Sequence, residues 1–517
     1  MHIFWHLLPY TLQSLPPIME IGGSAADSQR KGRGFMRLKE LLEGITVLSA
    51  TADMELEIPD VSYDSRTVRP GGLFVAMTGF AVDGHDFIGK AMEAGAAAVL
   101  CQRVPEGNVS YIQTADSRRA LAVVGANFFG HPAEDMTMAG ITGTNGKTSS
   151  TYLLKAILEQ AAGAKVGLIG TNQNMVGQEI IPTERTTPES FELQRLFAQM
   201  RDAGCTHVVM EVSSHALALD RVYGVRYQVG VFTNLTQDHL DFHGTMEEYC
   251  GAKALLFRNC GTGVVNADDP WTPRLTAEAS CEIFTYAEAA EADLRAEDIV
   301  LAADHVAFTA VTREQRVPIR VNIPGRFMVY NTLDVLGAAL AMGISLEDSA
   351  RVLAEVPPVK GRVEVVPTPG KDYTVLIDYA HSPDGLENIL SSVRGFAKGR
   401  TVAVFGCGGD RDRTKRPKMG RTAAQNADFL VVTTDNPRTE DPEAIIADIL
   451  PGLEGYGTPY EVVVDRIKAI HWAMDHAEQG DVIVLCGKGH ETYQEVNHIK
   501  HHMDEREIVA DYLAGGE

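Results

Sequence analysis

The chain has 517 residues, enough for about three domains of ordinary size. Its 69 acidic and 46 basic residues give a formal net charge of −23, which disfavours nucleic acid or an anionic membrane as a partner. The 7 cysteines are scattered without a C-x-x-C pair, so we expect reduced thiols in a cytoplasmic protein. No apolar run approaches the length of a membrane-spanning helix.

Residues 1–35 differ from the rest of the chain. The apolar run from Ile3 to Leu12 has no basic stretch before it and no clear cleavage site after it, so we do not interpret it as a signal peptide. Because Gly22 to Gly34 is polar, we predict that residues 1–35 form a disordered extension. Met36 opens an amphipathic helical pattern and is a candidate for the natural start.

Residues 36–131 are predicted to form a small α/β domain. Apolar runs from Leu73 to Met77 and from Ala96 to Cys101 predict strands, and Asp86 to Ala94 predicts a helix. The turn Asp64-Ser65-Arg66 is a candidate ligand loop, although the residues alone favour an ordinary polar turn.

A glycine-rich loop, GITGTNGKT from Gly140 to Thr148, lies at the start of a predicted central domain, residues 132–360. An apolar run from Met136 precedes it and a helical pattern to Gln160 follows, which is the strand–loop–helix order of a phosphate-binding site. Lys147 is placed to neutralise phosphate and the Thr148 hydroxyl to bind Mg²⁺. Ile141 occupies the position of the usual first glycine, and an ordinary βα turn is the alternative.

Further apolar strands alternate with helical patterns through this domain, which predicts a doubly wound, largely parallel sheet. The predicted strands are Val166 to Ile169, His207 to Met210, Gln228 to Phe232 and Gly263 to Val265. Because ligands bind beyond the carboxyl ends of such strands, the polar residues at these ends are candidate site residues.

Two of these candidates suggest metal or phosphate chemistry. Glu211 follows one strand and offers carboxylate oxygens to Mg²⁺. The segment from Thr233 to His243 follows the next and contains two histidines and two aspartates, which favours a metal or phosphate role over a structural one. A later helix carries Lys253, which by itself would be interpreted as a solvated lysine.

A second doubly wound sheet is predicted for residues 361–517. Its strands are predicted over four ranges, Tyr373 to Ile377, Thr401 to Phe405, Phe429 to Thr434 and Asp481 to Leu485. The loops after them carry both charges at close quarters, as the binding of an amino-acid zwitterion requires.

Together these motifs resemble the ATP-dependent Mur ligases of peptidoglycan synthesis, and within them the branch that adds meso-diaminopimelate. The resemblance rests on the loop from Thr142 to Thr148 and on six further segments, and it covers the chain from Met36 onward. The further segments are Asp64–Arg66, Thr186–Pro188, Glu211–His215, Asn234–His239, Asp378–His381 and Asp435–Arg438. It implies a small α/β N-terminal domain, a central P-loop-type sheet and a C-terminal Rossmann-like sheet.

The resemblance also implies a reaction. A glutamyl side-chain carboxylate of UDP-N-acetylmuramoyl-L-alanyl-D-glutamate attacks the γ-phosphate of ATP, and the amine of diaminopimelate displaces phosphate from the resulting acyl-phosphate. It implies two Mg²⁺ sites and a CO₂-derived carbamate on Lys253. The partners are small molecules alone, and we expect a monomer.

The family's site residues map onto matching positions. The catalytic positions are Lys147, Glu211, His239, Lys253, Arg362 and Asp378. The ATP positions are Gly143, Thr144, Asn145, Gly146, Lys147, Thr148, Asn331 and His381. Mg²⁺ is assigned to Thr148, Glu211, His239 and the carbamate of Lys253. The UDP-substrate positions are Ser65, Thr186, Thr187, Ser213 and Arg221. The diaminopimelate positions are Arg411, Asp435, Asn436, Arg438, Gly487 and Glu491.

Two positions depart from the family pattern. Met328 replaces an asparagine near the ATP site, and a thioether cannot donate the amide hydrogen bond. Leu219 stands where some relatives carry glutamine, so one dipeptide contact is expected to be missing.

Other functions stay open at this point. A lysine-adding ligase, or a folylpolyglutamate or cyanophycin type of enzyme, shares the fold. Lysine lacks the second carboxylate that Arg438 would pair, which disfavours it. A nucleotide switch without amide synthesis would need Lys147 but not Lys253 and the third-domain loops together.

Overall fold

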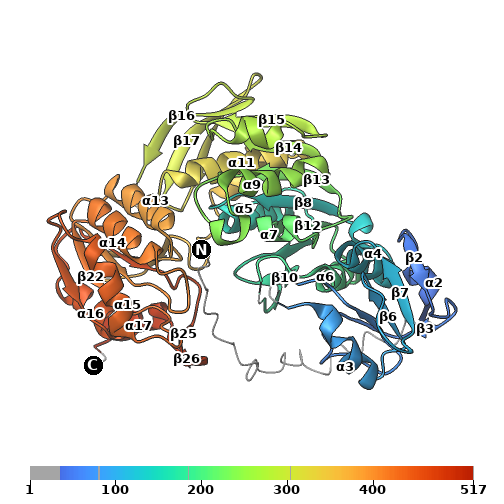
Figure 1. Cartoon of the computed structure of the whole chain (residues 1–517). Coiled ribbons are helices and arrows are strands. Elements are labelled where there is room, and N and C mark those ends of the chain that lie inside the picture. Colours follow the sequence, from blue (N-terminus) through green and yellow to red (C-terminus); the bar gives the residue numbers. More distant parts are fainter. Residues whose placement is uncertain (1–34, 80–81, 184, 303, 516–517) are drawn as a thin grey trace, which may run out of the picture. The chain divides into compact units, whose positions relative to one another are not determined.

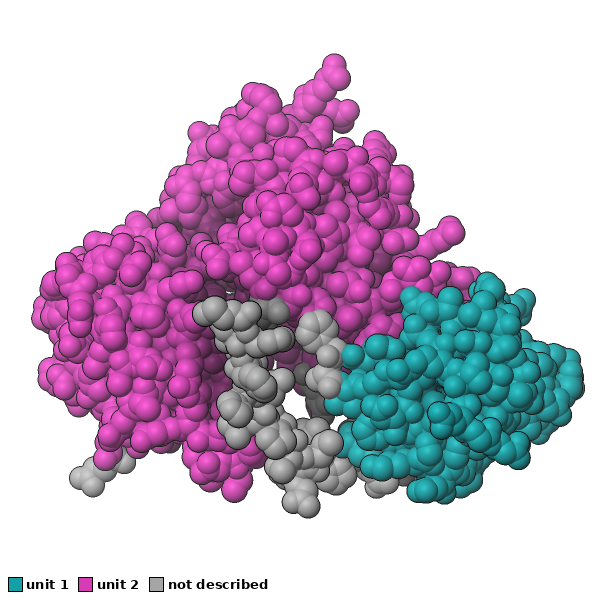
Figure 2. Space-filling view, viewed as in Figure 1, with its two compact units in different colours: residues 1–117 teal, residues 118–517 magenta. Residues whose placement is uncertain are grey.

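The computed structural model describes residues 35–515 except 80–81, 184 and 303. All but the last residue of the predicted extension, residues 1–35, therefore lies outside the described part of the chain. The chain divides into two compact units, residues 1–117 and 118–517, which Figures 1 and 2 colour by sequence and by unit. Among the described residues, no helix is both long and apolar enough to span a membrane.

The first unit is built on a five-stranded sheet in the order β2-β7-β6-β5-β4. Its strands are β2 (Val47–Ala50), β4 (Val61–Ser62), β5 (Leu73–Val75), β6 (Ala98–Cys101) and β7 (Tyr111–Thr114). The predicted helix over residues 86–94 is a 3-10 turn, η2 (Gly84–Phe87), followed by α3 (Ile88–Glu93).

The helix predicted from Met36 is shorter than its amphipathic pattern indicates. Met36–Arg37 is a two-residue strand, β1, which pairs with β3 (Glu57–Ile58), and only α2 (Leu38–Leu41) is helical. Leu38 and Leu41 are fully buried. The apolar spacing therefore predicts correctly which residues are buried. The first two residues, Met36 and Arg37, form a strand instead of a helix because they pair with β3.

The second unit contains an 11-stranded sheet in the order β11-β10-β9-β12-β8-β13-β14-β15-β16-β17-β18. Strands β9 to β16 in this order pair in parallel, and the four strands at the two ends pair antiparallel. The parallel strands are β8 (Thr137–Thr142), β9 (Val166–Ile169), β12 (His207–Glu211), β13 (Tyr227–Phe232), β14 (Cys260–Asn266), β15 (Glu282–Ala287) and β16 (Leu294–Leu301). The antiparallel ones are β10 (Asn174–Val176), β11 (Glu179–Ile181), β17 (Val306–Val311) and β18 (Arg316–Val321). The mostly parallel, doubly wound sheet predicted for the central domain is confirmed.

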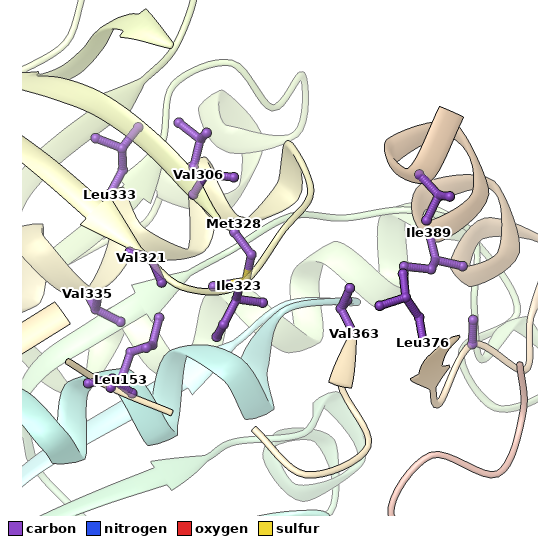
Figure 3. Close-up of a cluster of buried hydrophobic side chains, with 14 of the residues drawn as sticks. Leu153, Val306, Val321, Ile323, Met328, Leu333, Val335, Val363, Leu376 and Ile389 are labelled. Atoms are coloured by element: carbon purple, nitrogen blue, oxygen red, sulfur yellow. The ribbon is translucent and has the colours of Figure 1, made fainter. Parts of the chain in front are cut away.

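Helices cover this sheet and bury its apolar residues. The main ones are α5 (Lys147–Gln160), α6 (Ser190–Asp202), α9 (Met246–Ala254), α11 (Phe327–Ala341) and α12 (Leu346–Leu353). Met328, on α11, is fully buried and lies among Ile323, Val321 and other apolar side chains in Figure 3. This departure from the family pattern is therefore a core residue here.

The last part of the chain forms a six-stranded sheet in the order β19-β20-β24-β21-β22-β23. Its strands are β19 (Glu364–Val366), β20 (Thr374–Asp378), β21 (Thr401–Phe405), β22 (Phe429–Val432), β23 (Tyr460–Val462) and β24 (Val482–Cys486). All pairs are parallel except β19 with β20. It carries α13 (Pro383–Arg394), α14 (Lys415–Asn426), α15 (Pro442–Ile449), α16 (Arg466–Asp475) and α17 (Glu505–Leu513). A hairpin, β25 (Tyr493–Val496) and β26 (Ile499–His502), follows β24.

Candidate active site

The predicted phosphate loop connects β8 to the first residue of α5. Gly143 has φ 150° and Gly146 has φ 89°, and a Cβ at either position would collide with a neighbour. The added atom would lie 1.8 Å from Thr233 Oγ1 at Gly143 and 2.4 Å from Asn331 Oδ1 at Gly146. Only glycine fits these positions.

Residues after β13 tie this loop down. The Asn145 amide donates to Asn234 Oδ1 at 3.0 Å, and Asn234 Nδ2 donates back to the Asn145 carbonyl at 3.1 Å. Thr233 Oγ1 donates to the same carbonyl at 2.6 Å. Thr233 and Asn234 therefore hold the loop through the backbone of Asn145. The N-terminus of α5 is left to face a phosphate group.

Two lysines converge on the loop. Lys147 Nζ donates to the carbonyls of Gly143 and Thr144 at 2.9 and 2.8 Å, and Lys253 Nζ donates to the Gly143 carbonyl at 2.7 Å. Lys253 is 1% exposed, so it is not the solvated helix lysine that its local sequence indicates. Burial holds the pKa of Lys253 well below the usual lysine value, and the nearby Lys147 lowers it further.

Tyr249 supports Lys253 from one helical turn earlier in α9. Its ring centroid lies 4.4 Å from Lys253 Nζ, and its hydroxyl is 3.1 Å from Thr144 Oγ1. Sequence reasoning did not assign a role to Tyr249, although its i, i+4 spacing to Lys253 is a detectable signal.

Oxygen atoms suited to Mg²⁺ gather beside the start of α5. Thr148 Oγ1 donates to Glu211 Oε1 at 2.9 Å, and Glu211, at the end of β12, is 1% exposed. Thr171 donates to both oxygens of the same carboxylate through its amide and hydroxyl, each at 2.9 Å. Hydroxyl and carboxylate oxygens are the ligands that Mg²⁺ prefers, so Thr148 and Glu211 fit such an ion.

His239 lies in a group of aromatic rings at the start of α8 (Leu240–His243). Its backbone is left-handed with φ 52°, its side chain is 47% exposed, and its ring centroid is 4.8 Å from that of His215. Across the described residues, no three His, Cys, Asp or Glu side chains are grouped to hold a metal ion.

The residues assigned to the UDP substrate in the second unit lie together. Thr187 Oγ1 donates to the Glu211 carbonyl at 2.8 Å and accepts from the Ser213 amide at 3.1 Å. Arg221 Nη1 donates to the Thr187 carbonyl at 3.2 Å, and Thr186 Oγ1 lies 3.0 Å from Thr171 Oγ1. Ser65 is half-buried in the first unit, between Asp64 and Arg66, whose ion pair spans 2.6 Å.

Residues in and beside the six-stranded sheet, here called the third sheet, approach the phosphate loop. Arg362 Nη2 donates to Thr148 Oγ1 at 3.3 Å, and Asn145 Nδ2 donates to Asp384 Oδ2 at 3.4 Å. Asp378 accepts from the amides of Val363 and Ala380 at 2.9 and 2.8 Å. Burial raises the pKa of Asp378, and the charge of Arg362 opposes that shift.

The other two ATP-assigned residues are placed differently. Asn331 is 4% exposed and its Nδ2 donates to Met328 Sδ at 3.6 Å, so the substituted methionine is an acceptor for the neighbouring asparagine. His381 is exposed, and its Nδ1 lies 2.7 Å from the Tyr379 carbonyl.

The loop after β22 carries the residues assigned to the amino acid. Asp435 and Asn436 are 8% and 4% exposed. Among the described residues, Asp435 Oδ2 is buried without a hydrogen-bond partner. A Cβ on Gly487, which has φ 113°, would lie 2.4 Å from that oxygen, so glycine is needed to leave it room.

Arg438 has a left-handed backbone with φ 51° and a side chain that is 19% exposed. Its Nη1 donates to the Gly409 carbonyl at 2.8 Å, and its Nε lies 3.3 Å from Glu495 Oε2. The premise that lysine would leave Arg438 without an acidic partner therefore does not hold. Among the described residues, Nη1 is the nitrogen of this guanidinium that makes a hydrogen bond. Arg411 lies on the neighbouring loop and donates to the Asp410 carbonyl.

Sequence reasoning missed two residues of this site. Lys488 is fully buried and donates to both Asn436 Oδ1 and Glu491 Oε2 at 2.7 Å. Glu495, on β25, partners Arg438. Lys488 had a detectable signal because it follows Gly487 directly, whereas Glu495 had none.

The chain matches three family descriptions. "Mur ligase family, catalytic domain" matches residues 57–139, "Mur ligase middle domain" residues 141–339 and "Mur ligase, glutamate ligase domain" residues 361–489.

Similar proteins extend over almost the whole chain. The chain is 46% identical to UDP-N-acetylmuramoyl-L-alanyl-D-glutamate–2,6-diaminopimelate ligase 1 of Clostridium acetobutylicum, over 92% of this chain and 99% of that protein. It is 47% identical to the ligase of the same name from Clostridium botulinum, over 88% and 95%. A solved structure titled as this type of ligase is 30% identical, covers 93% of this chain and 99% of its own, and superimposes with a TM-score of 0.68. The chain therefore belongs to the Mur ligase family.

Proposed function

We propose that this protein is an ATP-dependent ligase that joins meso-diaminopimelate to the D-glutamyl side-chain carboxylate of UDP-N-acetylmuramoyl-L-alanyl-D-glutamate. The observation that carries the proposal is that relatives 46–47% identical across nearly their whole length are named as ligases of this type. The phosphate loop and the charged loops of the third sheet support it chemically.

A carboxylate is a poor acyl donor, so it must gain a leaving group before an amine attacks. In the proposed first step, an oxygen of the glutamyl carboxylate bonds to the γ-phosphorus of ATP, and ADP leaves with the electrons of the broken bond. In the second step, the amine nitrogen bonds to the acyl carbon, phosphate leaves, and the amine loses a proton. The products are the amide, ADP and phosphate.

The chain's own residues would neutralise and position these anions. Lys147 now donates to two loop carbonyls, and it can turn to a phosphate oxygen without leaving the loop. Arg362 already reaches Thr148 from the third sheet, so its cation lies near the same end of α5. Thr187, Ser213 and Arg221 would hold the dipeptide beside them.

Mg²⁺ would be held by Thr148 and Glu211 at one site and by His239 and Lys253 at another. A bound Mg²⁺ would neutralise charge on the transferring phosphoryl group. We propose that Lys253 carries a carbamate, which turns a cation into an oxygen ligand. CO₂ reacts with the neutral form of an amine. Lys253 is buried and its pKa is lowered well below the usual value, and both features support the proposal.

At the other end, Asp435 and Glu491 would accept from an ammonium group, and Arg438 and Asn436 would donate to a carboxylate. We further propose a monomer acting in the cytoplasm on small-molecule substrates. All seven cysteines are free, which agrees with a reducing compartment.

A lysine-adding ligase is the second candidate, because the Arg438–Glu495 pair allows Arg438 to remain paired without a ligand. The test is ADP release from ATP with the UDP-muramoyl-dipeptide and either diaminopimelate or lysine, with each substrate omitted in turn. We expect release that depends on all three substrates and on diaminopimelate. Equal or faster release with lysine would replace the assignment of the amino acid, and release without any amino acid would end the proposal.

A further inference from the structure

Lys488 is a buried cation that touches two residues of the proposed amino-acid site. Its side chain is 0% exposed, and its Nζ donates to Asn436 Oδ1 and to Glu491 Oε2, both at 2.7 Å. The same nitrogen lies 5.2 Å from the ring centroid of Tyr493. The two hydrogen bonds use two of the three N–H groups of the ammonium, and both go to residues of the proposed site.

The contact with Lys488 fixes which way the Asn436 amide faces. Asn436 Oδ1 accepts from Lys488 Nζ and also from the Glu495 amide at 2.9 Å, which occupies both of its lone pairs. One N–H of its Nδ2 donates to Glu491 Oε2 at 2.9 Å. The second N–H is what Asn436 can offer a ligand, and a flipped amide would set its NH₂ group against the Lys488 ammonium.

The same cation orders Glu491. Both of the bonds that Glu491 accepts from Lys488 and Asn436 go to Oε2, so Oε1 is the oxygen that a ligand can approach. The Glu491 side chain is 13% exposed, and a carboxylate with so little water needs a nearby positive charge. Lys488 therefore leaves the site with one directed donor and one directed acceptor.

We propose that Lys488 is a positioning residue for amino-acid recognition. It fixes the orientation of Asn436 and Glu491, so that Asn436 donates to the ligand's carboxylate while Glu491 accepts from its ammonium group. The proposal rests on the proposed function, because it needs an amino acid as the ligand of these loops. Lys488 itself touches neither the amino acid nor the phosphates.

Removing the ammonium while keeping the length of the side chain tests this role. Lys488→Met should lower kcat/KM for diaminopimelate by about a hundredfold, mainly through KM. The variant leaves the Glu491 carboxylate without its cation and lets the Asn436 amide turn either way. KM for ATP and for the UDP-muramoyl-dipeptide should stay within about twofold, because those sites lie elsewhere.

A matched control is Lys155→Met, which removes another buried lysine that pairs with a glutamate. Lys155 is 6% exposed and its Nζ lies 2.5 Å from Glu159 Oε1 on α5, away from the amino-acid loops. We expect Lys155→Met to lower the melting temperature without changing KM for diaminopimelate. If both variants change KM for diaminopimelate equally, or if Lys488→Met weakens all three substrates equally, Lys488 is only structural.

A double-mutant cycle separates positioning from general damage. Since Lys488 acts partly through Glu491, Lys488→Met combined with Glu491→Gln should lose less than the product of the two single losses. Losses that multiply would overturn the proposal. Should Lys488→Met fail to fold, Lys488→Gln keeps one amide donor and should lose about tenfold; an unchanged KM for diaminopimelate would contradict the proposal. If the parent enzyme shows no diaminopimelate-dependent ADP release, the proposed function fails instead.

Discussion

Lys147 and Lys253 donate to one carbonyl oxygen, that of Gly143, at 2.9 and 2.7 Å. One lysine comes from the phosphate-loop helix and the other from a helix more than a hundred residues later in the chain. Two cationic groups at one acceptor repel each other, and the deeper one, Lys253, loses its proton more easily. Burial also lowers the pKa of Lys147, though less, so Lys253 is the lysine better suited to the proposed carbamate.

Lys147→Ala should reduce ADP release by at least about a thousandfold, because it removes the neutralising cation beside the phosphate loop. The fold should survive, since Lys147 bonds only loop carbonyls. Lys165→Ala is the control, because Lys165 also donates to a carbonyl, that of Ala203, but it precedes β9 at the opposite edge of the sheet from the loop. Turnover by Lys147→Ala near the parent rate would contradict the assignment of the loop.

Lys253→Ala should lose most activity, and added formate or acetate should restore part of it by replacing the missing anion. Lys253→Arg should stay inactive, since arginine is a permanent cation and forms no carbamate under these conditions. Steady-state ADP release with and without the added carboxylate measures both effects. Full activity of Lys253→Arg would show that the carbamate is not required.

Arg438→Ala should lower kcat/KM for diaminopimelate by roughly a hundredfold, on the order of 3 kcal/mol, and leave ATP saturation unchanged. The variant loses the ligand's carboxylate partner and also leaves Glu495 without its cation. Arg413→Ala is the control, because Arg413 is 69% exposed and pairs with Glu440 outside the assigned residues. If Arg438→Ala and Arg413→Ala had the same kcat/KM for diaminopimelate, the identity of the amino-acid substrate would remain unassigned.

Gly487→Ala should abolish measurable use of diaminopimelate, because the new Cβ would lie 2.4 Å from Asp435 Oδ2 and displace that carboxylate. Gly343→Ala separates this collision from backbone strain. Gly343 has φ 80° and no atom within 4 Å of an added Cβ, so it should cost about 1 kcal/mol of stability but no activity. Normal diaminopimelate kinetics in Gly487→Ala would show that Asp435 is not a ligand.

His490 makes the stability of the third sheet depend on pH. Burial lowers its pKa to about 4 from an ordinary 6.5, helped by the charges of Arg362 and Arg506. Between those two values the unfolded chain binds a proton at His490 that the folded chain does not. The free energy of unfolding should therefore fall as pH drops from 6.5 toward 4.

The effect of His490 is isolated by comparison with His490→Asn, which has no titrating ring. Urea unfolding at pH 7 and pH 5 should show that the parent loses about 1–2 kcal/mol more than the variant over this interval. Equal losses would mean that His490 titrates normally in the folded protein.

Local sequence was sufficient for the phosphate loop and for most strands, because a strand, a glycine loop and a helix follow one another without intervening structure. It was less accurate where pairing decides the outcome. Met36 and Arg37 join a strand although their spacing is helical, and Asp378 is the last residue of β20 rather than the first residue beyond it. A few hydrogen bonds to a neighbouring strand determine where a strand begins and ends, and that neighbouring strand is distant in sequence.

The order and spacing of the motifs determined by themselves that this is a three-part α/β ligase with a phosphate loop, because those motifs consist of neighbouring residues. Only the tertiary structure decided that Lys253 is buried and that Met328 is a core residue. It also decided that Glu495 pairs with Arg438 and that Lys488 donates to Asn436. Each depends on which side chains from separate elements share a space closed to water. Burial and pairing of this kind set the charge and polarity of a group, and its sequence neighbours do not record them.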